Sequence, residues 1–194
     1  MILETKRLIL RKPKKSDWKD IVEGCKELDV AKNISTIPNP YKKKDAELFI
    51  ENALKKWRKK DKDGYMFFIE LKDEKKVIGS TSLYSINKLS KKAKTGSWIN
   101  KKYWRKGYIL EAKISILDFA FNKLKLEKLE SGARVKNRAS NLMSKNLGFK
   151  NEGTKRKSTF YKATNEICDM NIYGLLKSEW KENRSKIIKR LNKY

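Results

Sequence analysis

The sequence contains no histidine and only two cysteines among its 194 residues. The lack of histidine excludes a catalytic triad with a histidine base and a zinc site built on histidine. Cys25 and Cys168 lie far apart without metal-ligand spacing, so we expect free thiols rather than a disulfide. No segment approaches the ~20 continuous apolar residues of a membrane helix, and residues 1–4 lack the layout of a signal peptide. These absences predict a cytoplasmic protein with neither a metal nor a membrane as partner.

Acidic residues are also scarce, with 23 Asp and Glu against 49 Lys and Arg, a net charge of +26. Such a field attracts phosphates, RNA and acidic protein surfaces, and it repels polycations. The same excess is expected if the lysines only form the solvent-exposed face of every helix, as in proteins adapted to a hot or salty habitat. Charge alone therefore leaves the function open, and association with RNA or a ribosome is one expectation among others.

Hydrophobic periodicity divides the chain into alternating strands and helices. Alternation at period 2 predicts strands at residues 5–11 and 129–135, and further strand-like runs lie at residues 66–71, 77–86 and 95–99, near Thr159 and near Met170. Helical spacing predicts helices at residues 16–28 (capped by Ser16 or Asp17), 46–57, 109–124, 137–147 and 181–191. The strand–helix–strand order from residue 95 to residue 135 implies one parallel crossover. The predicted fold class is therefore α/β, with helices on both faces of one mixed sheet.

Residues 104–108, Trp-Arg-Lys-Gly-Tyr, separate the expected strand 95–99 from the long helix. A helix start offers free backbone N–H groups and the positive end of the helix dipole. Gly107 has no Cβ to block an anion, and Arg105 and Lys106 add positive charge. The pattern predicts a pyrophosphate site, although an ordinary strand-to-helix turn can be built from the same residues.

Several short motifs occur together in one order along the chain. They are TKRLILR at 5–11, VIG at 77–79, GSWI at 96–99, YWRKGY at 103–108, NRAS at 137–140, LGF at 147–149, EG at 152–153, GLL at 174–176 and EW at 179–180. In this order and spacing, residues 5–180 resemble the GNAT superfamily of N-acetyltransferases. The resemblance is closest to the branch that acetylates the N-terminal alanine or serine of ribosomal proteins. It implies a mostly antiparallel sheet of about seven strands in one domain, residues 1–180, followed by a basic helical tail, residues 181–194.

The resemblance also implies acetyl-coenzyme A (acetyl-CoA) as the acetyl donor, with no metal. The superfamily's pyrophosphate signature, Q/R-x-x-G-x-G/A, falls on residues 104–109 and departs from its usual form at Trp104 and Ile109. The branched Ile109 occupies a position at which the donor passes close to the backbone in the family, which implies weakened or reoriented donor binding. The implied donor-binding residues are Ser97, Trp98, Ile99, Arg105, Lys106, Gly107, Tyr108, Ile109, Leu110 and Asn137. Asn137 is equally suited to cap the helix that follows it.

Acetyl transfer needs a neutral amine, a held oxyanion and a proton for the departing thiolate. Ser140 matches a serine thought to protonate the thiolate in the ribosomal-protein branch, and the tyrosine that many members use is Ser144 here. The common base position is Gly132, so Glu130, on the same side of its strand, becomes the first candidate base and Glu70 the second. Each glutamate is alternatively a surface partner of lysines, and a water relay can replace a base.

The acceptor is expected to be an amine that is easily deprotonated. An N-terminal α-amine has a pKa of about 7.7–8, against about 10.4 for lysine. We therefore expect direct attack in a ternary complex by the N-terminal α-amine of a protein, with ribosomal proteins among the candidates. A small-molecule amine and a catalytically weak RNA- or ribosome-binding module are the alternatives. The chain is expected to act as a monomer or a homodimer.

Overall fold

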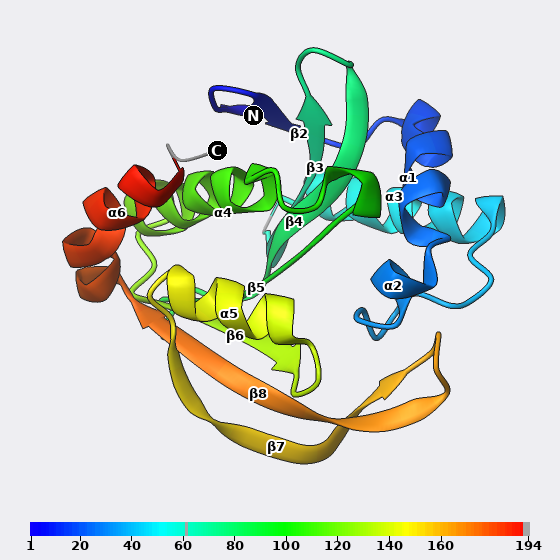
Figure 1. The fold of residues 1–194 in the computed structure, drawn as a ribbon. Helices are drawn as coiled ribbons and strands as arrows, with labels where there is room; N and C mark the ends of the chain where they lie inside the picture. Colours follow the sequence, from blue (N-terminus) through cyan, green and yellow to red (C-terminus); the bar gives the residue numbers. More distant parts are fainter. Residues whose placement is uncertain (61, 192–194) are drawn as a thin grey trace.

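The computed structural model describes residues 1–60 and 62–191. Its strands form one sheet in the order β1-β2-β3-β4-β5-β6-β8-β7, and every described neighbouring pair is antiparallel except β5 and β6 (Figure 1). The strands are β1 (Leu3–Glu4), β2 (Leu8–Arg11), β3 (Gly64–Leu71), β4 (Lys76–Asn87), β5 (Lys92–Ile99), β6 (Lys128–Arg134), β7 (Lys150–Tyr161) and β8 (Glu166–Leu176). The helices are α1 (Trp18–Cys25), α2 (Leu28–Ala31), α3 (Lys43–Arg58), α4 (Tyr108–Asp118), α5 (Arg138–Asn146) and α6 (Lys177–Leu191). The predicted mixed α/β sheet with one parallel pair is confirmed.

Two hydrophobic cores cover the two faces of this sheet. Phe67 and Ile69 of β3 point into the core beneath α4 and α6, whereas Phe68 points into the core beneath α1 and α3. Because successive side chains of a strand alternate between faces, a strand buried on both sides appears in the sequence as an unbroken apolar run. This burial explains the Met-Phe-Phe-Ile segment that begins at Met66.

Several element boundaries differ from the sequence predictions. The strand expected at residues 5–11 is a tight hairpin, with Thr5 N–H donating to Leu8 C=O at 3.0 Å, and the extra strand β1 brings the sheet to eight. The helix expected at residues 16–28 is a 3₁₀ turn (Lys15–Asp17), then α1, then α2. Asp17 does not cap α1, because its carboxylate binds the Arg11 guanidinium through two hydrogen bonds of 2.9 Å. Tertiary ion pairing thus overrides the local capping preference.

The C-terminal helix is part of the domain's core. It begins at Lys177 rather than Lys181, and both Trp180 and Ile187 are 2% exposed. Asp118 of α4 accepts hydrogen bonds from Trp180 Nε1 at 3.0 Å and from Arg184 at 2.7 Å. These contacts hold α6 against α4. The last residues of the expected tail, 192–194, lie outside the described part of the chain.

Candidate functional site

The parallel strands β5 and β6 separate part of the way along their length. They pair from Lys92 with Lys128 to Thr95 with Ser131, and within the described chain the pairing stops there. We call this last pair the closed end. Residues 96–99 of β5 and 132–134 of β6 continue from it toward an open end without pairing to each other, while each strand stays paired to its outer neighbour. We call these two unpaired stretches the β5–β6 divergence. It leaves a free backbone edge in the middle of the sheet.

The free edge of β5 is formed by alternate residues. Asn100 N–H donates to Ile78 C=O at 2.8 Å, which sets the alternation of the antiparallel ladder between β5 and β4. The N–H and C=O groups of Ser97 and Ile99 therefore point away from β4 and toward the divergence. Trp104 Nε1 donates to the Ile99 carbonyl at 2.9 Å. The backbone N–H and C=O of Ser97 and the N–H of Ile99 are left for an extended ligand.

The loop that follows β5 turns sharply into α4. Gly107 has a φ of 76° and Arg105 a φ of 61°, so two residues of this short loop occupy the left-handed region. Arg7 braces the loop from the turn before β2: its Nη1 donates to Lys106 C=O at 3.0 Å, and its guanidinium stacks 4.4 Å from the Tyr108 ring centre. The loop therefore has one defined shape, and the exposed Arg105 and Lys106 lie at its surface.

Glu111 completes the bracing in the first turn of α4. Its carboxylate accepts from Arg7 Nε at 2.7 Å and from Arg7 N–H at 2.8 Å. Burial alone would raise the pKa of Glu111, but hydrogen bonds from Thr5 and Arg7 outweigh it and hold the pKa below the usual value. The negative charge also suits the positive end of the α4 dipole. Arg7 and Glu111 are site-shaping residues that the sequence analysis did not identify.

The donor-binding residues predicted from sequence fall into two groups. Ser97 and Ile99 lie on the free edge, and the residues from Arg105 to Ile109 form the loop and the start of α4. Trp98 and Leu110 have side chains buried in the two cores, 9% and 8% exposed, so only their backbone can face a ligand. The structure thus brings the predicted stretch together at one end of the divergence.

Asn137 and Ser140 lie at the start of α5, directly after β6. Asn137 Oδ1 accepts a hydrogen bond from Ser140 N–H at 3.1 Å, so Asn137 caps the helix. This cap uses the oxygen and leaves the amide Nδ2 free to donate elsewhere. Asn141 ties α5 to the sheet, because it donates to Arg134 C=O at 3.0 Å and accepts from the Tyr173 hydroxyl at 2.8 Å.

The two candidate bases lie in different places. Glu130 is on β6 opposite Lys94, one residue before the last β5–β6 pair, and is 23% exposed. Its only ion pair among the described residues is a long contact of 3.8 Å with Lys92 Nζ. Glu70 lies on β3, two strands away from the divergence, and binds Arg11 Nε at 2.5 Å. The structure therefore places Glu130, and not Glu70, beside the divergence.

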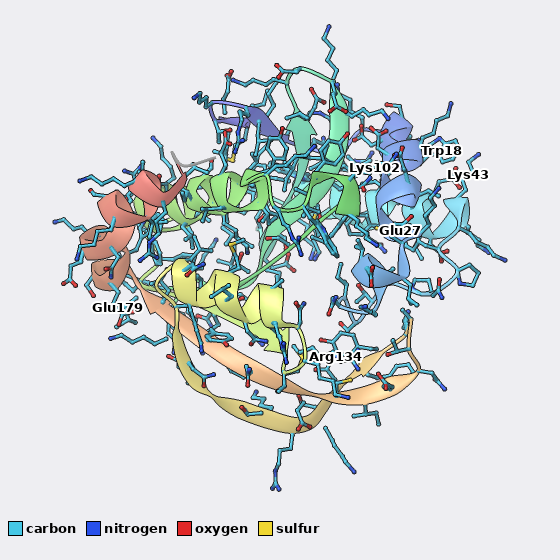
Figure 2. The ribbon with its side chains drawn as sticks, viewed as in Figure 1. Trp18, Glu27, Lys43, Lys102, Arg134 and Glu179 are labelled. Atoms are coloured by element: carbon cyan, nitrogen blue, oxygen red, sulfur yellow. The ribbon has the colours of Figure 1, made fainter. Side chains whose placement is uncertain are left out.

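The β7–β8 hairpin curves around one side of the sheet to reach the α2 region (Figure 1). Lys162 N–H donates to Ser35 C=O at 3.2 Å, which docks the hairpin tip on the segment after α2. Arg134, labelled at the end of β6 in Figure 2, donates to Lys32 C=O at 3.1 Å and also binds Glu166 of β8. These contacts join the end of β6 to α2 and β8.

Lys113 is a further buried residue next to the divergence that the sequence analysis did not single out. It is 7% exposed, and its Nζ donates to Thr95 Oγ1 at 2.9 Å. Thr95 belongs to the last β5–β6 pair. A signal was present in the sequence, since Lys113 is a charge one turn after Ile109 in a helix that is otherwise apolar on that side.

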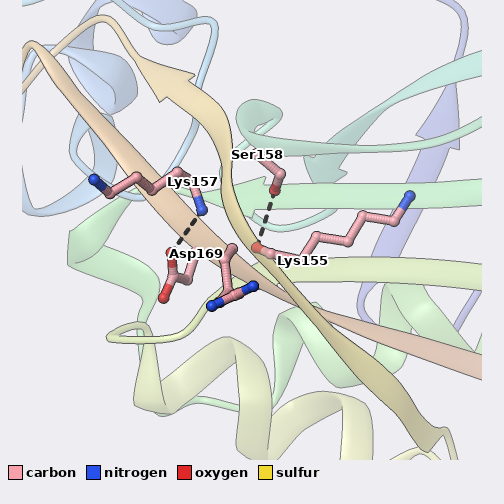
Figure 3. Close-up of a pocket in the computed structure, with 5 residues that line it drawn as sticks. Lys155, Lys157, Ser158 and Asp169 are labelled. Atoms are coloured by element: carbon pink, nitrogen blue, oxygen red, sulfur yellow. Dashed lines mark hydrogen bonds between the residues drawn. The ribbon is translucent and has the colours of Figure 1, made fainter.

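A separate shallow hollow lies on the β7–β8 hairpin and is lined by Lys155, Arg156, Lys157, Ser158 and Asp169 (Figure 3). Lys157 N–H donates to Asp169 Oδ1 at 2.7 Å, which closes a bulge in β7. β6 lies between this hollow and β5, so the hollow is not on the free edge of β5. Among residues 1–60 and 62–191, no group of three His, Cys, Asp or Glu is arranged to hold a metal, and no helix is long and apolar enough to cross a membrane.

Comparison with known proteins identifies the family. A family model of the acetyltransferase (GNAT) domain matches residues 7–150. YoaA of Bacillus subtilis, an uncharacterized N-acetyltransferase, is 27% identical over 176 residues, which cover 91% of this chain and 97% of that protein. YdaF of the same organism, provisionally named a ribosomal N-acetyltransferase, is 29% identical over 135 residues, 70% of this chain and 73% of that protein.

Solved structures show the same fold. RimL, a ribosomal L7/L12 α-N-protein acetyltransferase in complex with coenzyme A, has a TM-score of 0.79 at 16% identity and covers 91% of this chain and 98% of its own. The chain belongs to the GNAT acetyltransferase family and is an N-acetyltransferase that uses acetyl-CoA as its acetyl donor.

Proposed function

We propose that acetyl-CoA binds along the β5–β6 divergence with its pyrophosphate at the start of α4. The left-handed Gly107 and the free N–H groups of the first helical turn suit an anion. The free C=O of Ser97 and the N–H of Ile99 suit the amides of the extended pantetheine arm, which would add to the sheet like a short strand. Asn137 Nδ2 approaches the same arm from the side of β6.

The acceptor that fits this site best is the N-terminal α-amine of a protein, with a ribosomal protein as the first candidate. The observation that carries this proposal is the position of Glu130, a partly exposed carboxylate beside the closed end with only a long ion pair. A carboxylate of this kind is a weak base, which suffices for an α-amine of pKa about 7.7–8 but not for a lysine of about 10.4. The net charge of +26 further disfavours polycationic acceptors.

The reaction then needs one direct attack. The neutral α-amine attacks the thioester carbonyl, and Glu130, directly or through one water, accepts the proton that the amine loses. The Ser97 N–H, the free β5 donor nearest the closed end, holds the oxyanion, and the Ser97 C=O and the Ile99 N–H remain for the amides of the arm. When the carbon–sulfur bond breaks, the Ser140 hydroxyl gives its proton to the thiolate, and the proton held by Glu130 returns to Ser140 through water. The products are an N-terminal acetamide and coenzyme A.

Thiol release from acetyl-CoA tests the acceptor. Three acceptors are compared: a peptide with a free N-terminus and no lysine, the same peptide with a blocked N-terminus and one lysine, and spermidine. We expect release only with the first, and mass spectrometry should place the acetyl group on its α-amine. Faster release with spermidine, or with the blocked peptide, would reject the α-amine proposal and leave the acetyl-CoA site intact.

The catalytic residues are tested in the same assay. Glu130→Gln should lower kcat about 10²-fold with little change in the KM for acetyl-CoA, and Ser140→Ala should lower kcat to a smaller extent. Glu51→Gln is a matched control, because Glu51 is an exposed carboxylate of α3 that pairs with Lys55 at 3.0 Å. An equal effect of the Glu130 and Glu51 changes would rule out Glu130 as the base.

A further inference from the structure

Lys113 is a buried cation with unused hydrogen-bonding capacity. Its Nζ donates to Thr95 Oγ1 at 2.9 Å, and the Thr95 hydroxyl itself donates to Ser82 C=O at 2.9 Å, so Thr95 acts toward the lysine as an acceptor. Lys113 makes no ion pair with any described residue. An ammonium group has three N–H donors, so two of them lack a partner among residues 1–60 and 62–191. A buried polar group in this condition costs free energy unless a ligand binds it.

Lys113 lies where the thioester end of the acetyl donor is expected. It lies one helical turn after Ile109, so both side chains project from the same side of α4. Thr95 marks the closed end of the divergence, four residues before Ile99, or about 13 Å at 3.3 Å per residue. If the pyrophosphate lies at Gly107, beyond the open end, the arm runs toward Thr95 and its thioester end comes closest to Lys113.

We propose that Lys113 is a donor-binding residue that contacts the thioester end of acetyl-CoA from the α4 side of the sheet. Its free N–H groups donate to an amide or thioester carbonyl of the arm. Glu130 lies at the same closed end on the opposite face, because Lys94, its partner, precedes Thr95 by one residue. The donor is thus held between a cation on one face and a carboxylate on the other. This inference rests on the placement of acetyl-CoA proposed above.

Calorimetric binding of two ligands tests the role of Lys113. Acetyl-CoA carries the arm, whereas adenosine 3′,5′-bisphosphate carries only the nucleotide phosphates. Lys113→Met nearly keeps the volume of the side chain and removes its donors. We expect it to weaken acetyl-CoA binding about tenfold or more and to leave adenosine 3′,5′-bisphosphate binding within about twofold of the wild type. Lys186→Met, the loss of an exposed lysine of α6, should change neither affinity.

Two outcomes overturn the inference. Unchanged acetyl-CoA binding by Lys113→Met shows that the lysine has no role in the donor site, and equal weakening of both ligands shows an indirect structural effect. Gly107→Val tests the proposed position of acetyl-CoA separately. A branched residue at a φ of 76° should distort the loop and weaken the binding of both ligands. If Gly107→Val changes the affinity for neither ligand, the pyrophosphate does not bind at Gly107.

Discussion

Replacing Lys113 by methionine should stabilise the ligand-free protein at pH 6 by on the order of 5 kcal/mol. Burial lowers the pKa of Lys113 from 10.5 to about 7, and desolvation is the cause. Each pH unit between these two values corresponds to about 1.4 kcal/mol of differential stabilisation. The variant removes this cost and keeps the volume of the side chain. Thr95 still donates to Ser82 C=O at 2.9 Å, so the change strands no hydroxyl donor.

The pH dependence gives the prediction its sign. Below pH 7 lysine is protonated in both the folded and the unfolded chain, and folding carries the full cost of burying the charge. Between pH 7 and pH 10.5 only the unfolded chain holds the proton, so the wild type gains stability as the pH rises. The advantage of the variant should therefore fall from about 5 kcal/mol at pH 6 to about 2 kcal/mol at pH 9.

The acidic residues near Lys113 pair with other cations. Glu111 on the same helix binds Arg7, and Glu130 on β6 contacts Lys92. Lys94 of β5 projects from the opposite face of the sheet, because it alternates with Thr95. Desolvation is therefore the cause of the lowered pKa of Lys113.

Urea unfolding of the two proteins at pH 6 and pH 9 measures the difference directly. Because the free energies of unfolding of the variant and the wild type are compared at the same pH, the contributions of all other titrating groups cancel. Lys186→Met, at an exposed site, should change stability by less than about 0.5 kcal/mol at both pH values. A less stable Lys113→Met at pH 6, or an advantage that does not shrink by pH 9, would refute the idea of a buried, destabilising charge.

Three further predictions follow from other parts of the structure. Asp17→Asn should cost about 3 kcal/mol in urea unfolding, because Arg11, a buried guanidinium that also binds Glu70 at 2.5 Å, loses a charged partner at 2.9 Å. Gly107→Ala should cost about 1 kcal/mol in the same measurement, since alanine is strained at a φ of 76°, and it should raise the Kd for acetyl-CoA in calorimetry. With a peptide acceptor, Glu130→Gln should lower kcat and kcat/KM by the same factor, because the loss of a base removes stabilisation of the transition state alone.

Local patterns in the sequence were sufficient for much of the fold. The strand-like runs at residues 66–71 and 77–86 correspond to β3 and β4 within a few residues. The helical spacing after Ile109 corresponds to α4 and the π-helical turn Phe119–Lys123 that continues it. Patterns failed where a distant partner decided the structure. Asp17 is a good helix cap by type, but Arg11 binds it. The strand expected from residue 95 begins earlier, at Lys92, because β5 pairs there with Asn87 and Lys128.

The candidate site was predicted in part. The loop of residues 104–108 and the start of α5 were identified from residue types, because a glycine before a helix and an asparagine before another are local signals. The bracing of the loop by Arg7 joins residues 99 positions apart, and no local signal reveals it. Nor does spacing along the chain show that Glu70 binds Arg11 while Glu130 lies beside the divergence.

The sequence by itself determined the order of strands and helices, the excess of positive charge and the loop that resembles a pyrophosphate site, since each depends on residues close together in the chain. Only the tertiary structure decided where β5 and β6 separate, because that point depends on how each strand pairs with its other neighbour. The tertiary structure also brought Lys113 against Thr95, 18 residues away, at that point. A lysine that would be solvated on an isolated helix becomes a buried cation there, because packing of α4 on the sheet removes its water.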